Sequence, residues 1–258
     1  MPKYVAKQPD AQGFVDYTDA ENKVWGTLIK RQMTIIEKYA CDEFLDGLHK
    51  LNFAEDRIPQ CSEVSDALRP HTGWAVEPVA AIIPFKQFFQ LLTDKKFPAA
   101  TFIRRKEELD YLQEPDIFHE FYGHCPLLTQ PAYADFVQWY GENALEADPE
   151  LYPILGRLFW FTIEFGLLNT SKGLRIYGGG ILSSYQETQY ALDSKKPKRV
   201  PFDLKAVINT EYRYDIIQEI YYIIERLDSL FELKQIDIIQ FIANNLEQKH
   251  QGKDKFIC

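Results

Sequence analysis

Two of the chain's five histidines stand five residues apart, in the stretch PDIFHEFYGHCP that covers residues 115–126. An α-helix turns about 100° per residue, so an offset of five on an unbroken helix would point the two side chains about 140° apart. Gly123 and Pro126 are residue types that end helices. We therefore expect a helix to end between His119 and His124, so that both imidazoles reach one metal ion. The alternative is two unrelated histidines, one at a helix cap and one packed in the core.

A third ligand is expected from a carboxylate whose position is otherwise hard to explain, because an unpaired buried charge is costly. Residues 158–168 read LFWFTIEFGLL, in which Glu164 is the only charge among large apolar side chains. A solvated helix face would carry a charge every three or four residues. Glu164 is therefore the predicted third ligand, and the alternative is a buried pair with Arg157 or Arg175. Weaker candidates, which lie in more polar stretches, are Asp116, Asp135 and Glu142.

Two imidazoles and one carboxylate are the ligands of non-haem Fe(II) oxygenases with open coordination positions, and also of zinc hydrolases. A hydrolase would use Glu120 as its general base and would more naturally carry it on an unbroken HExxH helix. A non-catalytic protein that binds a small molecule or a partner is a third hypothesis. The oxygenase is favoured because both ligand segments are crowded with aromatic residues that suit a flat aromatic reactant: Phe118, Phe121, Tyr122, Phe159, Trp160, Phe161 and Phe165.

Three blocks of sequence carry a resemblance to a known family. PDIFHEFYGHCP, then WFTIEFG at 160–166 and YGGGILSSYQETQY at 177–190, resemble the pterin-dependent aromatic amino acid hydroxylases, and most of all their bacterial phenylalanine-hydroxylating members. The resemblance extends upstream through TGWAVEPVAAIIPFKQFF (72–89) and FIRR (102–105), and downstream through EYRYDIIQEIYYI (211–223). It therefore covers most of the chain.

The resemblance implies a non-haem Fe(II) monooxygenase that uses a tetrahydropterin and O₂ to convert L-phenylalanine to L-tyrosine. A tyrosine or tryptophan hydroxylase of the same family is the alternative. The implied metal ligands are His119, His124 and Glu164, in agreement with the choice made from the residues alone. The implied pterin-binding residues are Phe88, Glu120, Ile83 and Phe159. The implied substrate-binding residues are Arg104, Trp160, Phe165, Ser183, Ser184 and Glu187.

Three of these implied roles have a physical basis or a competing explanation. Glu120 would act in catalysis by facing the pterin and helping to direct the oxygen chemistry. A planar guanidinium at Arg104 would suit the substrate carboxylate, although the neighbouring Arg105 is indistinguishable from it by sequence. For Phe88, helical spacing with Phe85 and Leu92 by itself favours a core residue.

Composition bounds the class of protein. With 258 residues and 46% hydrophobic content, the chain can bury a substantial core. Its net charge of −9 argues against nucleic acid or an anionic membrane as the main partner. No apolar N-terminal segment or membrane span is present, and the four cysteines form no CxxC motif, so we expect reduced thiols in the cytoplasm. The last predicted helix is too short for a tetramerising coiled coil, which favours a monomer or homodimer.

The expected fold is mainly α with small β elements (α+β), of the aromatic amino acid hydroxylase type. Residues 1–20 are expected to form a loosely ordered lead-in, and residues 21–258 a single helix-rich catalytic domain that includes the C-terminal helices. Loops and short strands are predicted over 57–84, and a solvated basic loop over 194–203. Helices are predicted over about 20–39, 44–51, 84–95, 115–123, 131–145 and 151–169, from Ile208 to Leu230, and over 234–247.

Overall fold

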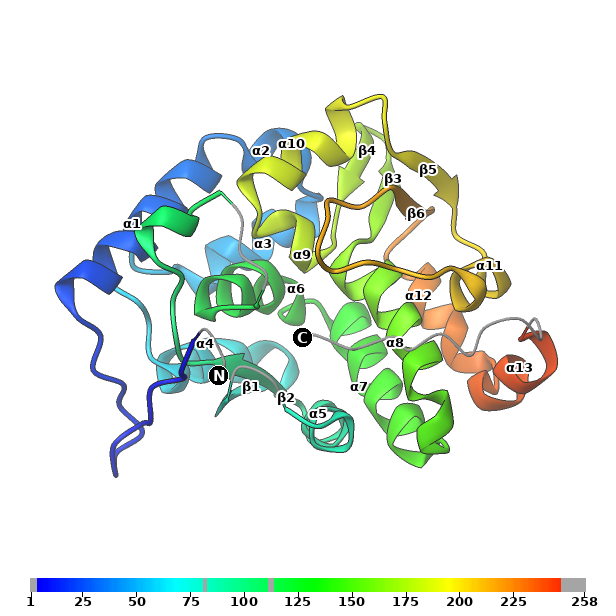
Figure 1. Cartoon of the computed structure of the whole chain (residues 1–258), viewed down its shortest axis with the longest axis horizontal. Helices are drawn as coiled ribbons and strands as arrows, with labels where there is room; N and C mark the ends of the chain where they lie inside the picture. Colours follow the sequence, from blue (N-terminus) through cyan, green and yellow to red (C-terminus); the bar gives the residue numbers. More distant parts are fainter. Residues whose placement is uncertain (1–3, 81–82, 111–113, 247–258) are drawn as a thin grey trace.

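The computed structural model describes residues 4–80, 83–110 and 114–246, and Figure 1 shows their arrangement. Two short segments, η2 (His119–His124) and η4 (Trp160–Glu164), are π-helices, and η1 (Lys106–Glu108), η3 (Pro149–Leu151) and η5 (Leu233–Gln235) are 3₁₀-helices. The α-helices are α1 (Asp19–Met33), α2 (Ile36–Tyr39), α3 (Asp42–Leu51), α4 (Cys61–Thr72), α5 (Phe85–Thr93), α6 (Cys125–Leu128), α7 (Pro131–Glu146), α8 (Tyr152–Phe159), α9 (Gly179–Leu182), α10 (Tyr185–Asp193), α11 (Leu204–Asn209), α12 (Ser229–Glu232) and α13 (Ile238–Asn245).

The strands form two small sheets among these helices. β1 (Ala75–Val79) and β2 (Lys96–Ala100) pair in parallel and lie against α4 and α5 (Figure 1). The larger sheet has the order β4-β3-β6-β5, from β3 (Leu167–Thr170), β4 (Gly173–Ile176), β5 (Lys198–Pro201) and β6 (Ile220–Ile224). β3 and β4 are antiparallel, whereas β6 runs parallel to both of its neighbours. The predicted fold class, helix-rich with small β elements, is confirmed.

The first predicted helix is interrupted. Thr18 starts α1 with a capping box, in which its side chain accepts from the Glu21 backbone and the Glu21 carboxylate accepts from the Thr18 backbone. At the other end, the Thr34 hydroxyl donates to the carbonyl of Arg31 at 2.6 Å, and Ile35 N donates to the carbonyl of Gln32 at 3.0 Å. These hydrogen bonds span three residues instead of four, so the last turn is tighter than an α-helical turn, and α1 ends before α2 begins.

Residues 57–84 contain a helix that the sequence prediction missed. Gln60 and Glu63 form a capping box at the start of α4, and Gly73, with φ 76°, ends it in the left-handed conformation. Val64 and Leu68, four residues apart, are buried, as are Cys61 and Ser65. The prolines on either side of this apolar pair, Pro59 and Pro70, led to the prediction of loops.

The long helix predicted from Ile208 to Leu230 is also wrong. α11 ends at Asn209, a segment without regular structure follows, and residues 220–224, IYYII, form β6. A short continuous apolar run with β-branched and aromatic residues fits a buried strand as well as it fits helical spacing. β6 is hydrogen-bonded to a strand on each side, and this pairing decides between the two. β5 likewise occupies part of the predicted basic loop 194–203.

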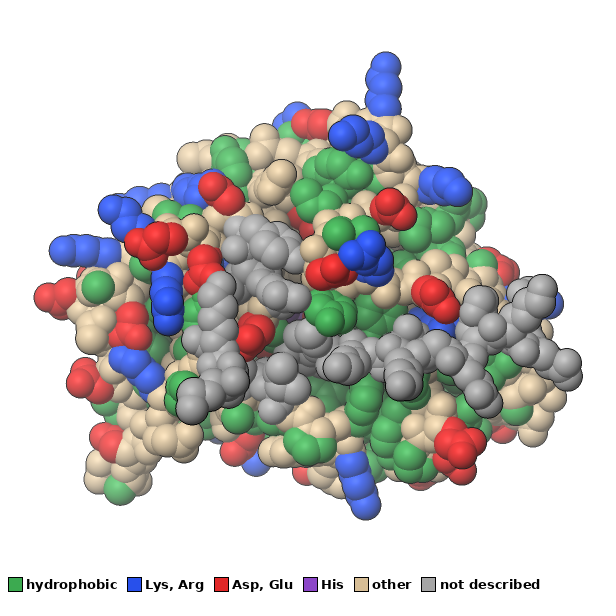
Figure 2. All heavy atoms as spheres, in the orientation of Figure 1, with side chains coloured by type: hydrophobic (Ala, Val, Ile, Leu, Met, Phe, Trp, Pro, Cys, Tyr) green, Lys and Arg blue, Asp and Glu red, His purple; other side chains and the backbone are tan. Residues whose placement is uncertain are grey.

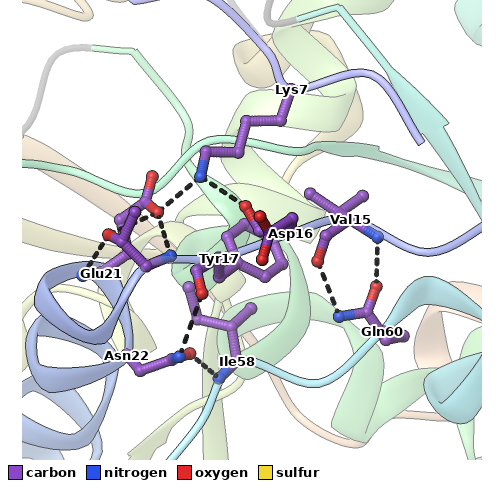
Figure 3. Close-up of polar contacts among 9 residues, drawn as sticks. Lys7, Val15, Asp16, Tyr17, Glu21, Asn22, Ile58 and Gln60 are labelled. Atoms are coloured by element: carbon purple, nitrogen blue, oxygen red, sulfur yellow. Dashed lines mark hydrogen bonds and ion pairs between the residues drawn. The ribbon is translucent and has the colours of Figure 1, made fainter. Parts of the chain in front are cut away.

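Residues 4–18 have little regular secondary structure, but side chains tie them to the domain (Figure 3). The amide of Gln60 accepts from Val15 N at 2.8 Å and donates to Val15 O at 3.1 Å. Lys7 Nζ donates to the carbonyl of Asp16 at 2.7 Å and to Glu21 at 2.6 Å. The lead-in is therefore held by polar contacts rather than by a helix or strand.

One face of the molecule, shown in Figure 2, carries acidic and basic side chains interspersed among apolar ones. No single-sign basic patch stands out among the described residues on that face, in keeping with the net charge of −9. Among the described helices, none has the length and apolar character needed to cross a membrane.

We expect Gly47 to be required for the contact of α3 with α6. A Cβ at this buried position would lie 2.0 Å from the carbonyl oxygen of Pro126, and backbone cannot rotate away as a side chain can. In an open helix Gly→Ala stabilises by about 1 kcal/mol. Here Gly47→Ala should instead lower the free energy of unfolding by roughly 2 kcal/mol or more, measured in urea. His49→Ala, at an exposed position of α3, is the control. A Gly47→Ala variant with a higher free energy of unfolding than the wild type would contradict the close contact of α3 with α6.

Candidate functional site

The site forms where α6, α8 and α9 approach one another near the middle of the molecule (Figure 1). η2 carries the two histidines of the site. Its hydrogen bonds span five residues, so residues five apart lie one above the other, and this explains the spacing of His119 and His124. Their Nε2 atoms are 3.1 Å apart. The prediction that a helix ends at Gly123 is wrong, because the chain continues helically into α6, where Pro126 is accommodated in the first turn. The predicted convergence of the two imidazoles is nevertheless correct.

Glu164 stands at the end of the second π-helix, η4, which continues α8. Its Oε1 atom lies 3.2 Å from His124 Nε2 and 3.7 Å from His119 Nε2. Ligand atoms that share a metal at about 2.1 Å and at right angles lie about 3 Å apart, so the three atoms fit one face of a coordination sphere. The alternative partners face elsewhere: Arg157 Nη1 donates to Ile208 O at 2.7 Å, and Arg175 Nη1 to Leu174 O at 2.9 Å. The residues therefore fit a metal with an open opposite face, as non-haem iron requires.

A second carboxylate, that of Glu120, lies close to the same point. One of its oxygens is within 4.8 Å of ligand nitrogens of His119 and His124. Burial raises the pKa of Glu120 to about 8. Burial also acts to raise the pKa of Glu164, but the adjacent imidazoles outweigh it and hold that pKa well below its usual range. Glu164 is the better third ligand because its Oε1 atom lies 3.2 and 3.7 Å from the two Nε2 atoms, and Glu120 is the alternative carboxylate beside the same histidines.

Ser183 orients the first imidazole. Its hydroxyl donates to Gly179 O at 2.9 Å, so its oxygen can accept from His119 Nδ1, which is also 2.9 Å away. A proton on Nδ1 leaves the lone pair of Nε2 facing the centre, as metal ligation requires. Burial acts to lower the pKa of His119, but the Glu164 carboxylate outweighs it and the pKa rises to about 9. Ser183, which the resemblance places near the substrate, thus lies beside the outer nitrogen of the candidate ligand His119 in this structure.

The glycine run 178–180 lets backbone pack against the ligand side chains. A Cβ at Gly179 would lie 2.5 Å from His124 Nδ1, and one at Gly180 would lie 2.7 Å from Glu164 Oε2. Larger residues at these positions would displace the imidazole and the carboxylate. The close approach of the glycine backbone therefore fixes the positions of two candidate ligands.

Arg104 is buried and pairs with Asp116. Its Nε donates to Asp116 Oδ2 at 2.8 Å and its Nη2 to Oδ1 at 2.9 Å. Asp116 also accepts from the backbone N of Arg104 and of His119, at 2.8 and 3.0 Å, so it orients the arginine and supports the start of η2 together. Asp116, a weaker metal candidate by sequence, is therefore a structural partner instead. Asp135 and Glu142, the other two weaker candidates, lie on α7 and are partly or fully exposed.

Aromatic rings lie close to the candidate ligands. Trp160 stacks on Tyr212 at a centroid distance of 4.3 Å and lies 4.6 Å from Phe165. On the other side, Phe159 is 6.5 Å from the His124 ring and 5.3 Å from Phe88.

Phe88 is buried on α5, and Ile83, just before that helix, is partly buried against the core. Phe88 therefore contacts Phe159, and it is also the core residue that its helical spacing favours.

Ser184 and Glu187 occupy the start of α10. Ser184 is the helix N-cap, whose side chain accepts from Glu187 N at 3.3 Å. Glu187 is buried, and its Oε1 accepts from the Tyr221 hydroxyl at 2.8 Å and from Gln218 N at 3.2 Å. Neither side chain is among the three that converge on the metal position.

Three site residues were missed or misplaced by sequence reasoning. Asp116 gave a signal, since a carboxylate three residues before a helical histidine is a capping position. Tyr212 was assigned to the face of a helix that does not form. Gln218, which lies in an irregular segment, gave no signal at all.

Ser183→Ala is expected to lower metal affinity by about 10- to 100-fold, because the outer imidazole nitrogen loses its partner. The affinity is measured by competition with a chelator of known strength. Ser184→Ala is the matched control: it removes a helix cap at a cost of about 1 kcal/mol in stability and should leave metal affinity unchanged. Equal metal affinity in Ser183→Ala and the wild type would contradict the role of Ser183.

Glu187 should give the folded chain a pH-dependent stability. Burial raises its pKa from 4.5 to about 7, against the opposing hydrogen bonds from Tyr221 and Gln218. The folded state keeps a proton that the unfolded state has lost, so stability falls as pH rises from about 4.5 to 7, by roughly 3 kcal/mol from this group. Glu187→Gln should remove that fall when metal-free proteins are unfolded in urea across pH 4.5–8. If the free energy of unfolding changed with pH in the same way for both proteins, this role of Glu187 would be contradicted.

Comparison with known proteins identifies the family. A family model described as biopterin-dependent aromatic amino acid hydroxylase matches residues 3–252. A phenylalanine-4-hydroxylase of Pseudomonas aeruginosa is 52% identical over 240 residues, which are 93% of this chain and 91% of that protein.

Solved structures agree with this match. The apo structure of the cold-active phenylalanine hydroxylase from Colwellia psychrerythraea is 52% identical, with a TM-score of 0.91 over 94% of each chain. The Chromobacterium violaceum phenylalanine hydroxylase with bound iron(III) and oxidised cofactor 7,8-dihydrobiopterin is 40% identical, with a TM-score of 0.85 over 92% of this chain and 89% of that one. The chain therefore belongs to the biopterin-dependent aromatic amino acid hydroxylases, the family that its motif blocks resemble.

Proposed function

We propose that the protein is a phenylalanine 4-monooxygenase, which converts L-phenylalanine to L-tyrosine with O₂, non-haem iron and a tetrahydropterin. The observation that carries the proposal is the convergence of His119, His124 and Glu164 on one point between aromatic walls. Membership of the family supports it, as does the name of a relative that is 52% identical, phenylalanine-4-hydroxylase.

The three converging side chains would hold the iron on one face. When bound, the iron and the tetrahydropterin together supply the activation of O₂ and the two electrons of the monooxygenation. The protein's part is to direct Nε2 of each histidine inward, and Ser183 orients the His119 ring through its contact with Nδ1. The backbone of Gly179 and Gly180 packs against the side chains of His124 and Glu164 and so limits how far these two candidate ligands can move.

Arg104 would bind the substrate carboxylate with the part of its guanidinium that is not used by Asp116. The bidentate pair with Asp116 fixes the plane of that guanidinium, and preorganisation of this kind lowers the entropy cost of orienting the substrate. Trp160 and Phe165 would enclose the substrate ring and exclude water from the reacting carbon. Ser184 and Glu187 are proposed to lie near the substrate as supporting residues.

The pterin would bind on the other side of the ligands, against Phe88, Ile83 and Phe159. An aromatic face is suited to stacking with a flat heterocycle. Glu120 would face the pterin, and burial raises the pKa of its carboxyl group above the usual range.

Phenylalanine is preferred to tyrosine and tryptophan as the substrate. The cytoplasm is the proposed location, supported by the free, buried thiols of Cys41, Cys61 and Cys125, while Cys258 lies outside the described residues. A monomer or homodimer is the proposed state. The zinc hydrolase is not supported, because η2 is no HExxH α-helix and the chain belongs to a hydroxylase family.

The activity is tested by loading the protein with Fe(II) without oxygen, and then adding L-phenylalanine, air and tetrahydropterin. L-Tyrosine should form, identified by chromatography, and it should not form in pterin-free or zinc-loaded controls. L-Tyrosine and L-tryptophan are offered as alternative substrates under the same conditions. Faster turnover of either alternative would overturn the substrate assignment, and no product from any of the three would overturn the activity.

Two isosteric variants separate the carboxylates. Glu164→Gln is expected to lower iron affinity by more than about 100-fold and to abolish product, because it removes the charged ligand. Glu120→Gln is expected to retain iron and to make less product. Iron content after desalting and the rate of tyrosine formation are measured on both. An iron-replete, active Glu164→Gln would refute the role of Glu164 as a ligand. Iron loss in Glu120→Gln alone would show that Glu120, and not Glu164, is the carboxylate ligand.

A further inference from the structure

The indole of Trp160 depends on a residue outside its own helix. Trp160 is buried in η4, and a buried indole N–H needs a hydrogen-bond acceptor. That acceptor is Gln218 Oε1, at 2.9 Å from Trp160 Nε1. Gln218 lies 58 residues further along the chain, in the segment without regular structure that precedes β6. The ring is therefore fixed by a bond to this segment as well as by its stacking on Tyr212, which belongs to the same segment.

The amide of Gln218 can adopt only one orientation. Its Nε2 donates to the carbonyl oxygens of Arg213 at 2.8 Å and Ile216 at 3.1 Å. A flipped amide would set an N–H against the indole N–H and an oxygen against two carbonyl oxygens, which loses all three bonds. One buried side chain thus closes residues 213–218 into a fixed turn and points its oxygen at Trp160.

This turn is anchored to α10 as well. Gln218 N donates to Glu187 Oε1, and the same oxygen accepts from the Tyr221 hydroxyl at the start of β6. The exposed ion pair between Arg213 and Asp215 in this segment adds less stability than these buried hydrogen bonds. Buried polar contacts, not regular structure, therefore place Tyr212 against Trp160.

We propose that Gln218 is a positioning residue for the aromatic substrate pocket. It sets the rotation of the Trp160 indole and holds the 210–219 segment, and with it Tyr212, so that both rings keep their positions as walls of the substrate pocket. The proposal rests on the proposed phenylalanine hydroxylation. Gln218 acts through Trp160 and Tyr212 and needs no contact of its own with the substrate.

Gln218→Met tests this role, because methionine keeps the length of the side chain and removes all three hydrogen bonds. KM for L-phenylalanine should rise about tenfold with kcat changed much less, since positioning of the ring is lost while the ligand set is untouched. The kcat/KM preference for L-phenylalanine over the larger L-tryptophan should fall by about tenfold, and iron content should stay at the wild-type level. In a Trp160→Phe background the effect of Gln218→Met should be smaller, because the indole bond is already gone.

Gln60→Met is the matched control, since the Gln60 amide also fixes an irregular segment, but at the N-terminal lead-in (Figure 3). It should lower thermal stability and leave KM and substrate preference unchanged. Gln218→Glu keeps an acceptor for the indole but sets an oxygen against the carbonyl oxygens of Arg213 and Ile216, so it should also raise KM for L-phenylalanine. This variant is used for the test if Gln218→Met does not fold. Wild-type KM and preference in a folded Gln218 variant would overturn the proposal. The formation of L-tyrosine by the wild-type protein in the same assay tests the proposed function separately from the role of Gln218.

Discussion

The structure depends on keeping the Glu164 carboxylate beside two imidazoles inside an aromatic core. A buried carboxylate in such a place needs close polar partners or a metal ion, and His124 and His119 Nε2 lie 3.2 and 3.7 Å from it. An α-helical offset cannot bring residues 119 and 124 to one side, so η2 adopts the wider π-turn, and η4 does so at the end of α8. Both departures from α-helical geometry occur where a proposed ligand must face the centre.

Two short helices, α9 and α10, support both halves of the site. From α9 and the residue after it, Gly179, Gly180 and Ser183 fix the proposed ligands by close backbone contact and by the bond to His119. From α10, Glu187 anchors the turn that contains Gln218, and through it the Trp160 wall. The metal position and the aromatic pocket are therefore built on a common support, and a shift of these helices would disturb metal affinity and substrate fit together.

Local chemistry explains what the sequence could and could not predict. Glu164 was identifiable because it is an isolated charge in an apolar run, and the histidines because two metal-binding side chains flank a carboxylate. The π-turn was not predictable, since glycine and proline near His124 are equally typical of a helix end. The sequence IYYII of β6 fits the spacing of a helix as well as that of a buried strand, so the sequence predicted a helix there. Only the hydrogen bonds to the neighbouring strands decide for a strand. Gln218 was not identifiable, because its role arises from contacts with residues far away in the sequence.

The central claim, that two imidazoles and one carboxylate hold iron on one face, is tested most directly by X-ray absorption of the anaerobically Fe(II)-loaded protein. The account predicts only nitrogen and oxygen neighbours at about 2.1 Å, with outer-shell scattering from two imidazole rings. Removal of the carboxylate in Glu164→Gln should abolish that spectrum. A sulfur neighbour, such as the Cys125 thiol beside His124, or scattering from a single imidazole, would contradict the account.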